Sequence, residues 1–291
     1  MIYILENDKL RIKISSMGAE LQSIRRADDD TEYLWQGDAK YWSGRAINLF
    51  PVCGRMFGGK YTYDGNTYEI GIHGFARKTE WKILRQSTDR LTLQLSDTEE
   101  TYKVYPFRFC AELTYSLDGN EIAVTWVVRN TDDKTLLFSL GGHPGFNVPL
   151  LPGETFEDYR IEFDEPCAPR KLLLSDTCFY LNDSEPFPLE DDRIIPLHHS
   201  MFDNDGIFLR DTCGGLTLTA GGAHHVHVGF ENIPIIGFWH TTRSDAPFIC
   251  IEPWLGVPAI DGKINALEEL PLMQKLPVDG VFRTGFTLQI D

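Results

Sequence analysis

Hydrophobic and polar residues alternate along much of this chain with a period of two, which is the pattern of β-strands with one buried face. The clearest case covers residues 107–115 and 122–128, with Asp118-Gly119-Asn120 between the two runs. Because Asp, Gly and Asn favour tight turns, this arrangement predicts a β-hairpin.

The same alternation recurs elsewhere in the chain. Residues 61–63 and 66–68 flank Asp64-Gly65, where glycine supplies the positive φ of a tight turn, so a second hairpin is predicted there. Shorter alternating runs comprise Leu91, Leu93 and Leu95; Leu216 and Leu218; and Phe286, Leu288 and Ile290.

Helical periodicity is almost absent, and one or two helical turns are predicted only at residues 266–270 and 38–43. No Gly/Ser-rich or Pro-rich linker divides the chain, and residues 166–196 are predicted to form a long connection with short strands. We therefore predict an all-β fold with few short helices. The whole chain, residues 1–291, is predicted to form a single domain, a large antiparallel β-sandwich of two facing sheets.

Composition narrows the classes of partner. The chain is 42% hydrophobic and 12% aromatic, enough for a substantial core. Its 27 Lys and Arg residues against 43 Asp and Glu residues give a formal charge of -16, which would repel nucleic acid and anionic membrane surfaces. We therefore predict a small uncharged ligand, with neither nucleic acid nor a membrane as partner.

The start of the chain and its cysteines bear on localisation. Residues 1–6 carry no basic region ahead of an apolar run, and no apolar run approaches the roughly 18 residues of a spanning helix. These features predict a cytoplasmic protein. The six cysteines show no Cys-x-x-Cys spacing, so we expect reduced and mostly buried thiols rather than a zinc or redox site.

Four segments interrupt the strand rhythm with ionisable residues in apolar or glycine-rich surroundings, where binding groups are often presented. Each segment also has a purely structural interpretation, as a surface charge, a turn residue, an ion pair or an Asx turn. The candidate residues are Arg55, His73 and Arg77 in the first segment, His143 in the second, Glu252 and Trp254 in the third, and Asp205 in the fourth.

His143 and Glu252 are the strongest candidates for acid–base chemistry. Glycines on both sides leave the His143 imidazole approachable, and Pro144 favours an extended backbone there. The period of two places Glu252 on the same strand face as Cys250. If that face is buried, the carboxyl loses water and its pKa rises above the usual value of about 4.3. The broad ring of Trp254 could stack on the apolar face of a sugar.

Other motifs are missing from the chain. It contains no GxGxxG, GxxxxGK[ST] or GxSxG string, so a nucleotide cofactor and a serine nucleophile are not predicted. His224, His225 and His227 lie close together but lack further ligands at a metal-binding spacing, so we interpret them as ordinary strand residues. The predicted protein needs no cofactor and no metal.

Five strings in order, FPVCGR, HGFAR, GGHPGF, NDGIF and ICIEPW, resemble those of the aldose 1-epimerase (galactose mutarotase-like) family, in particular its LacX-like branch. The resemblance spans nearly the whole chain and is specific because the strings keep their order and spacing. It implies a large antiparallel β-sandwich with a sugar bound in a cleft on one sheet. It also implies interconversion of the α and β anomers of a hexose or related sugar without a cofactor.

The resemblance also implies roles for individual residues. His143 corresponds to the general acid of the family and Glu252 to its general base. Arg55 and His73 resemble residues that contact sugar oxygens near the anomeric carbon, and Asp205 resembles the aspartate that binds a ring hydroxyl. The Gly-Gly-His-Pro string around His143 departs from the Asn-His-Thr type of the branch known for free galactose, which leaves the sugar open.

Alternatives remain open at this point. The Arg77 guanidinium could bind phosphate through two hydrogen bonds, so a sugar phosphate is an alternative to a free sugar. A non-catalytic carbohydrate-binding or regulatory protein would use the same cleft without needing a proton-transfer pair. A glycosidase would need two carboxylates, for which Asp205 and Glu252 are available. The presence of both His143 and Glu252 favours the epimerase.

Overall fold

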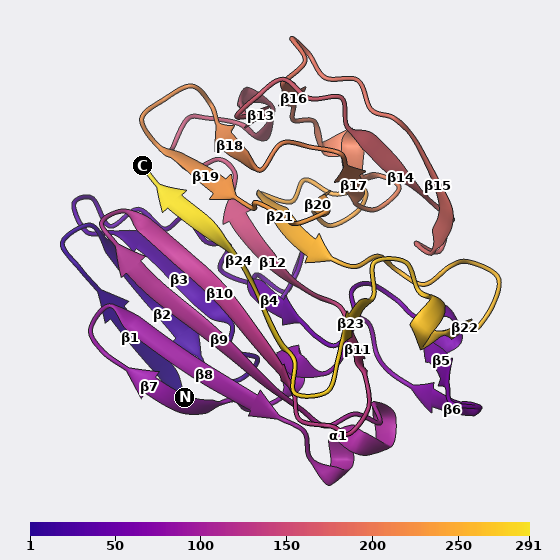
Figure 1. Cartoon of the computed structure of the whole chain (residues 1–291). Helices are drawn as coiled ribbons and strands as arrows, with labels where there is room; N and C mark the ends of the chain where they lie inside the picture. The colour runs from indigo at the N-terminus through magenta and orange to yellow at the C-terminus, as the bar shows by residue number, and fades with distance from the viewer.

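Two large sheets dominate the structure, a computed structural model that describes residues 1–291 (Figure 1). The first sheet has nine strands and is antiparallel throughout. In spatial order its strands are β16 (Ile194–Pro196), β13 (Arg160–Phe163), β18 (Gly215–Thr219), β19 (His225–Gly229), β24 (Val281–Ile290), β10 (Glu121–Asn130), β9 (Phe109–Asp118), β8 (Arg90–Ser96) and β7 (Lys82–Gln86).

The second large sheet has seven strands and is also antiparallel. In spatial order its strands are β15 (Tyr180–Pro186), β14 (Arg170–Leu174), β17 (Ile207–Arg210), β20 (Ile235–Trp239), β21 (Phe248–Leu255), β12 (Leu140–Asn147) and β4 (Ala46–Leu49). Strands β21 and β12 are neighbours in the interior of this sheet, so groups on them lie away from its edges.

Smaller elements surround the two sheets. The small sheets comprise β1 (Ile2–Glu6), β2 (Leu10–Ser15) and β3 (Leu21–Arg26); β22 (Asn265–Ala266), β5 (Lys60–Tyr63) and β6 (Asn66–Glu69); and β11 (Leu136–Phe138) with β23 (Gln274–Leu276). The helices are α1 (Glu99–Val104) and the 3₁₀ helices η1 (Phe57–Gly59), η2 (Ala76–Lys78), η3 (Phe156–Asp158), η4 (His199–Phe202) and η5 (Leu267–Glu269). None of these helices is long and apolar enough to cross a membrane.

The main hydrophobic core draws side chains from both large sheets. Leu113 and Trp126 from β9 and β10 belong to the same buried cluster as Ile249 and Ile251 from β21. Residues of β21 that alternate with these two, such as Cys250 and Trp254, belong instead to two smaller clusters. The two sheets therefore pack face to face, which confirms the predicted all-β antiparallel sandwich. The opposite face of the seven-stranded sheet carries the two smaller clusters instead.

The predicted strand patterns are confirmed. The first hairpin forms β9 and β10, which keep one register from Glu121 opposite Asp118 to Asn130 opposite Phe109. The second hairpin forms β5 and β6, and both residues of its turn, Asp64 and Gly65, have positive φ. The remaining alternating runs lie in β8, β18 and β24. Residues 166–196 contain the short strands β14, β15 and β16, as expected of that connection.

The helix predictions are only partly right. Residues 266–270 contain the 3₁₀ helix η5, whereas residues 38–43 form a turn and no helix. The backbone N–H groups of Tyr41 and Trp42 both donate to the Asp38 carbonyl, and no further helical hydrogen bond follows them. Helix α1 was not predicted, because it is a single short segment that Thr98 caps rather than one marked by an apolar stripe.

All six cysteines are free, but the expectation that most are buried is wrong. Cys53 and Cys250 are buried, and the other four are partly exposed. Cys110 lies on the less buried face of β9, and Cys167, Cys178 and Cys213 lie in loops, so none of the four occupies a core-facing strand position.

Candidate active site

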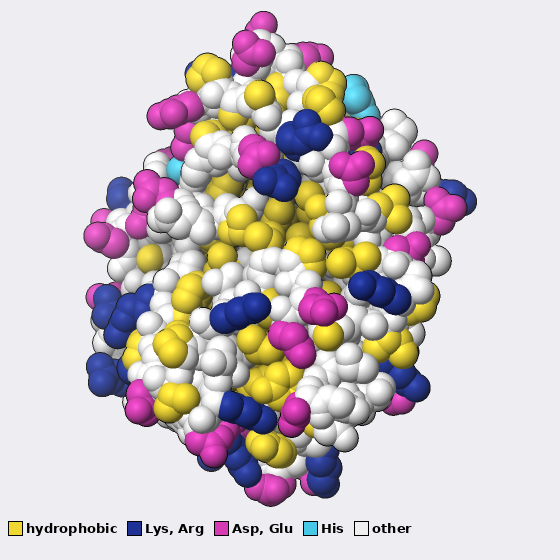
Figure 2. All heavy atoms as spheres, turned by 45° about the vertical axis from the view of Figure 1, so that its right-hand side comes forward, with side chains coloured by type: hydrophobic (Ala, Val, Ile, Leu, Met, Phe, Trp, Pro, Cys, Tyr) yellow, Lys and Arg dark blue, Asp and Glu magenta, His cyan; other side chains and the backbone are white.

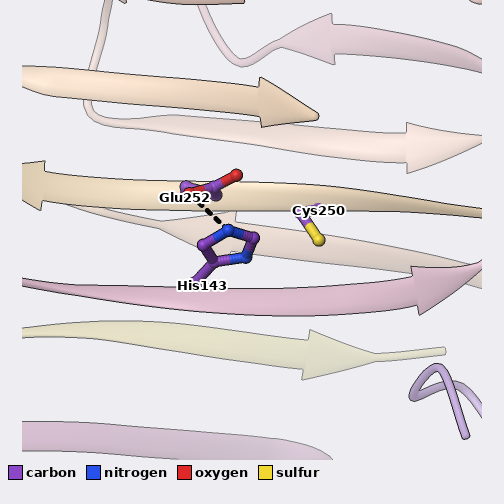
Figure 3. Close-up of side chains that lie close together, drawn as sticks. All are labelled: His143, Cys250 and Glu252. Carbon is purple, nitrogen blue, oxygen red and sulfur yellow. Dashed lines mark ion pairs between the residues drawn. The ribbon is translucent and has the colours of Figure 1, made fainter. Parts of the chain in front are cut away.

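His143 and Glu252 face each other across the neighbouring strands β12 and β21. Leu140 pairs with Leu255 and Asn147 with Phe248, and this register places residue 143 opposite residue 252. Nε2 of His143 lies 3.2 Å from Oε2 of Glu252, and both side chains are almost completely buried. Figure 3 shows the two groups pointing toward each other, with Cys250 beside them on β21. The structure therefore brings the predicted acid and base into contact.

Prolines interrupt the sheet at this point. The β12–β21 pairing is regular up to Gly141 opposite Trp254 and resumes at Gly145 opposite Cys250. Between these pairs lie Pro144 and Pro253, and a proline nitrogen carries no hydrogen to donate to the ladder. Proline is unusual in interior strands. The interrupted ladder coincides with the position of the His143–Glu252 pair.

Aromatic side chains surround the His143 imidazole. The Trp42 ring stacks on it with centroids 4.9 Å apart, and Trp239 and His73 each approach it edge-on at 5.6 Å. Trp254 lies edge-on to His73 at 5.5 Å. These rings, rather than the nine-stranded sheet, cover His143 and Glu252 on the outer face of the seven-stranded sheet and keep water away from them.

Burial shifts both members of the pair toward their uncharged forms. Loss of solvent lowers the pKa of His143 to about 3, with a smaller contribution from the positive charge of Arg77. Loss of solvent raises the pKa of Glu252 well above its usual value, and the negative charge of Asp205 adds to this rise. Across the 3.2 Å that separates them, burial thus favours the uncharged imidazole and the uncharged carboxyl over an ion pair.

No other protein group satisfies these polar atoms. Nδ1 of His143, both carboxyl oxygens of Glu252 and Nε1 of Trp254 are buried and make no well-aligned hydrogen bond. Unsatisfied buried polar atoms cost stability, so their gathering at one place indicates a site that a ligand completes.

His73 is held as a neutral hydrogen-bond donor. The backbone N–H of Gly54 donates to its Nδ1 at 3.2 Å, so the proton of the neutral ring resides on Nε2. Burial lowers the pKa of His73 well below its usual value, and the neighbouring His143 lowers it further. The backbone of His73 has a φ of 62°, which is unusual for a residue with a Cβ. The hydrogen bond from Gly54 holds the direction of the ring.

Arg55, Asp205 and Cys178 form a more exposed group. A terminal nitrogen of Arg55 lies 3.8 Å from Oδ2 of Asp205, and the Cys178 thiol donates to the same oxygen at 2.7 Å. Asp205 itself has a φ of 82°, and its Oδ1 accepts a hydrogen bond from the N–H of Gly206. This bond comes from the next residue along and not from the one after it, so it is not the bond of the predicted Asx-type turn, and the Asp205 carboxylate is held from two sides.

Arg77 is half-buried and has no ion-pair partner. Its buried Nε makes no hydrogen bond, and burial lowers its pKa, an effect that the charge of Glu20 opposes. A guanidinium in this position adds positive potential to the histidines, as the pKa directions of His73 and His143 show.

All seven candidate residues line one cavity of about 370 Å³ on the outer face of the seven-stranded sheet. The cavity also has lining residues that the sequence did not single out: Tyr41, Trp42, Cys178, Phe208, Trp239 and Thr241. Trp42 and Trp239 lay outside the predicted motifs. For Trp42, the sequence offered one signal. Tyr41 and Trp42 lie in a stretch without strand alternation, so their rings are not explained by packing on the face of a sheet.

One group of side chains could also offer ligands to a metal. The ligand atoms of His143, Cys250 and Glu252 all lie within 4.8 Å of one another. A cysteine binds metals as the thiolate, and burial raises the pKa of Cys250 well above its usual value. The environment therefore favours the protonated thiol. His225 and His227 form separate pairs with Asp291 and Asp164, outside this cavity.

Comparison with known proteins identifies the class to which this sandwich and its cleft belong. The family described as aldose 1-epimerase matches residues 1–199, so the chain belongs to the aldose 1-epimerase family. The chain is 34% identical to "Protein LacX, plasmid" of Lactococcus lactis subsp. lactis over 286 residues, covering 94% of this chain and 95% of that protein. The chromosomal LacX protein of the same organism is 33% identical over the same length.

Solved structures show the same architecture. A galactose mutarotase related enzyme from Lactobacillus acidophilus superposes with a TM-score of 0.96 at 33% identity, covering 100% of this chain and 97% of the other. A galactose mutarotase-like protein from Lactobacillus casei superposes with a TM-score of 0.94 at 28% identity, with both chains covered fully. The predicted family and fold are confirmed.

Proposed function

We propose that this protein is an aldose 1-epimerase that interconverts the α and β anomers of a hexose or related sugar, with His143 as general acid and Glu252 as general base. The observation that carries the proposal is the 3.2 Å contact between the two groups at a buried cavity. The cavity could enclose one pyranose ring, since clefts of about 300–1,000 Å³ bind small molecules.

Ring opening needs two proton transfers. Glu252, as the carboxylate, takes the proton of the anomeric hydroxyl, and the electrons of that O–H bond form the carbonyl. The bond between the anomeric carbon and the ring oxygen breaks, and the His143 imidazolium gives its proton to the ring oxygen. Burial favours the uncharged pair, so the reactive carboxylate–imidazolium form arises when the proton of the Glu252 carboxyl moves to Nε2 of His143.

Ring closure reverses these transfers. After rotation about the bond between the first two carbons, the hydroxyl attacks the other face of the carbonyl. Its proton returns to His143, and Glu252 returns its proton to the new anomeric oxygen. The pair ends in its starting state, so the cycle balances without a redox partner. Positioned acids and bases typically contribute about 10² to 10⁴-fold each.

The surrounding residues fit the binding of a sugar. The neutral His73 and the guanidinium of Arg55 supply donors to oxygens on which negative charge develops. Asp205 accepts hydrogen bonds from ring hydroxyls, and Trp254 offers an aromatic surface to the apolar face of the ring. A non-catalytic binding protein would need these groups but not a buried imidazole and carboxyl in contact with each other.

The experiment is anomer exchange measured by polarimetry or saturation-transfer NMR on freshly dissolved α-glucose and α-galactose. The wild type should exceed the spontaneous rate, and His143→Asn and Glu252→Gln should each return it to the spontaneous rate while leaving the circular dichroism spectrum that of the folded wild type. A protein that binds these sugars without accelerating exchange would be a binding protein, and the epimerase proposal would fail.

A sugar phosphate is the second candidate substrate, because Arg77 has no ion-pair partner at the cavity. If Arg77 binds a phosphate, Arg77→Ala should raise KM for glucose 6-phosphate about tenfold and leave KM for glucose unchanged, since charge-assisted hydrogen bonds are roughly twice as strong as neutral ones. An equal change in both KM values would favour the free sugar.

A further inference from the structure

Cys178 brings a thiol to the proposed active site, where it contacts a carboxylate. The residue is partly exposed, lines the cavity, and donates its S–H to Oδ2 of Asp205 at 2.7 Å. Asp205 and Glu252 are the only acidic residues that line this cavity. The proposed proton transfers use Glu252, so Asp205 is the carboxylate left to hold the sugar, and the direction in which it points matters for binding.

The thiol is carried by the turn that joins β14 to β15. The backbone N–H of Cys178 donates to the Ser175 carbonyl, and Cys178 has a φ of 65°, in the left-handed region. The N–H of Tyr180 donates to the Ala259 carbonyl, and the N–H of Ala259 donates to the Arg55 carbonyl. Backbone hydrogen bonds through Ala259 thus hold the turn that carries Cys178 close to the segment that carries Arg55.

Arg55 lies near Asp205 but does not form a hydrogen bond with it. Its terminal nitrogen is 3.8 Å from Oδ2, beyond the roughly 3.2 Å reach of an ordinary N–H···O bond. Oppositely charged side chains also lie beside one another elsewhere on the surface (Figure 2), and Arg108 approaches Asp97 to 2.7 Å. At Asp205 the Cys178 thiol, rather than the guanidinium, makes the hydrogen bond to this oxygen.

The thiol keeps its proton and therefore remains a donor. Burial raises the pKa of Cys178 to about 12, and the negative charge of Asp205 contributes to the rise. The other carboxylate oxygen, Oδ1, accepts a hydrogen bond from the N–H of Gly206. One bond to each oxygen fixes the plane of the carboxylate, and each oxygen keeps a further lone pair for the hydroxyl of a ligand.

A second feature of the cavity points to a polar ligand independently of Cys178. Both carboxyl oxygens of Glu252 are buried there without a hydrogen-bond partner. Buried polar atoms of this kind are rare unless something completes them. A ligand that satisfies Glu252 enters the same cavity that Asp205 and Arg55 line.

We propose that Cys178 is a positioning residue, whose thiol holds the Asp205 carboxylate toward the cavity and apart from Arg55, so that both charged groups are free to bind hydroxyls of the sugar. This inference rests on the proposed function, because it takes this cavity as the place where the sugar binds. Without the thiol, Arg55 and Asp205 would close into an ion pair and satisfy each other instead of the ligand.

The test measures KM and kcat by NMR anomer exchange, with α-glucose or α-galactose, whichever the wild type exchanges faster. Cys178→Ala should raise KM about fivefold, the effect of roughly one hydrogen bond. It should leave kcat unchanged, because the thiol bonds to Asp205 and not to either proton-transfer group. Cys178→Ser keeps a donor at the same place and should retain the KM of the wild type.

A double-mutant cycle links the effect to Asp205. Asp205→Gly removes the carboxylate while tolerating the φ of 82° at this position, and it should raise KM by itself. In that background Cys178→Ala should add nothing, because the thiol acts only through the missing group. The matched control is Cys110→Ala, which removes a partly exposed thiol from β9 in the other large sheet and should change neither constant.

Three results would overturn the positioning role. They are an unchanged KM in Cys178→Ala, an equal loss in Cys178→Ser, and additive losses in the double variant. Failure of the proposed function gives a different result, since the wild type would then exchange neither sugar. Calorimetric Kd values for the same sugars would decide the role in that case. Weaker binding in Cys178→Ala that Cys178→Ser restores would support it, and Kd values that do not weaken would contradict it.

Discussion

Two pairs of adjacent strands, one in each large sheet, differ in regularity and in what they bury. In the nine-stranded sheet, β9 and β10 pair without interruption over ten residues each, and the buried positions of β9 alternate with less buried ones. In the seven-stranded sheet, β12 and β21 also pair, but the ladder is interrupted at Pro144 and Pro253. Almost every side chain on these two strands is buried, including His143 and Glu252.

The difference separates stabilising structure from functional structure. The β9–β10 pair buries apolar groups and satisfies its backbone, so each contact lowers the free energy of the fold. The β12–β21 pair gives up ladder hydrogen bonds and buries polar atoms that lack partners. These features lower the stability of the fold. They also create a water-excluding site in which the pKa values of His143 and Glu252 are shifted. Substitutions in the two pairs should therefore have different consequences.

The largest effect is expected on catalysis at β12–β21. His143→Asn and Glu252→Gln should each remove the whole acceleration of anomer exchange, and the double variant should lose no more than either single variant. In the proposed mechanism both groups act in the same ring-opening step, so their effects on the rate do not add. The measurement is the exchange rate by saturation-transfer NMR. A double variant much slower than both singles would show that the two groups act independently.

In β9–β10 the expected effect is on stability instead. Leu113 is fully buried opposite Trp126, and Leu113→Ala should lower the free energy of unfolding by about 2–5 kcal/mol, because the substitution leaves a cavity in the core. Urea denaturation measures this loss. The kcat of the folded fraction should stay close to that of the wild type. A large fall in kcat at temperatures where the variant is folded would contradict the separation between the two pairs.

A smaller effect is expected at Gly237 of β20, which lies beside Glu252. A Cβ added there would lie 2.7 Å from the Phe208 ring and 3.2 Å from Cβ of Glu252. Gly237→Ala should displace the carboxyl slightly and lower kcat about tenfold, since misplacement of catalytic groups by fractions of an ångström is costly. Gly222→Ala is the control, because its Cβ would meet open space. Equal kcat values for the two variants would show that the Glu252 position is not set by this contact.

The shifted pKa values of His143 and Glu252 should also make the stability of the protein depend on pH. The raised pKa of Glu252 makes the folded chain hold a proton that the unfolded chain releases above about pH 4.3, so this group lowers stability as pH rises from there. The lowered pKa of His143, about 3, makes the unfolded chain take up a proton below about pH 6.5, so this group lowers stability as pH falls toward 3.

Each substitution should remove the pH dependence of stability that its residue causes. Compared with the wild type, Glu252→Gln should gain Tm at pH 8 relative to pH 5, and His143→Asn should gain Tm at pH 4 relative to pH 7. The changes should be about 2 °C or more, the shift that about 1 kcal/mol produces in a chain of this size class. Differential scanning calorimetry over this pH range measures them. Parallel profiles for wild type and variants would mean that neither group has a shifted pKa.

Much of the fold was predictable because period-two alternation is a local property. The runs that became β8, β9, β10, β18 and β24 carry it clearly. Residues 38–43 were predicted wrongly as helical, since a single turn ending at Trp42 has the local look of a helix start. Helix α1 was missed for the converse reason, because its signal lies in the Thr98 cap rather than in an apolar stripe.

The candidate site was predictable as a set of residues but not as an arrangement. Its six ionisable members stand out in the sequence because they interrupt the alternating pattern, and the five family strings contain these six residues and Trp254. Trp42, Trp239 and Phe208 look like any core aromatic residue in a linear chain. Their position around His143 and Glu252 depends on loops and strands that are distant in sequence.

The sequence by itself determined which residues alternate, where the chain turns, and which acidic and basic groups lie within apolar runs. Only the tertiary structure decided that residue 143 lies opposite residue 252, because register is set when two strands pair and not by either strand alone. It also decided that the Glu252 side chain faces away from the core between the two large sheets and is nevertheless buried from solvent. Alternation assigns side chains to two faces, but what covers each face depends on segments brought together by folding.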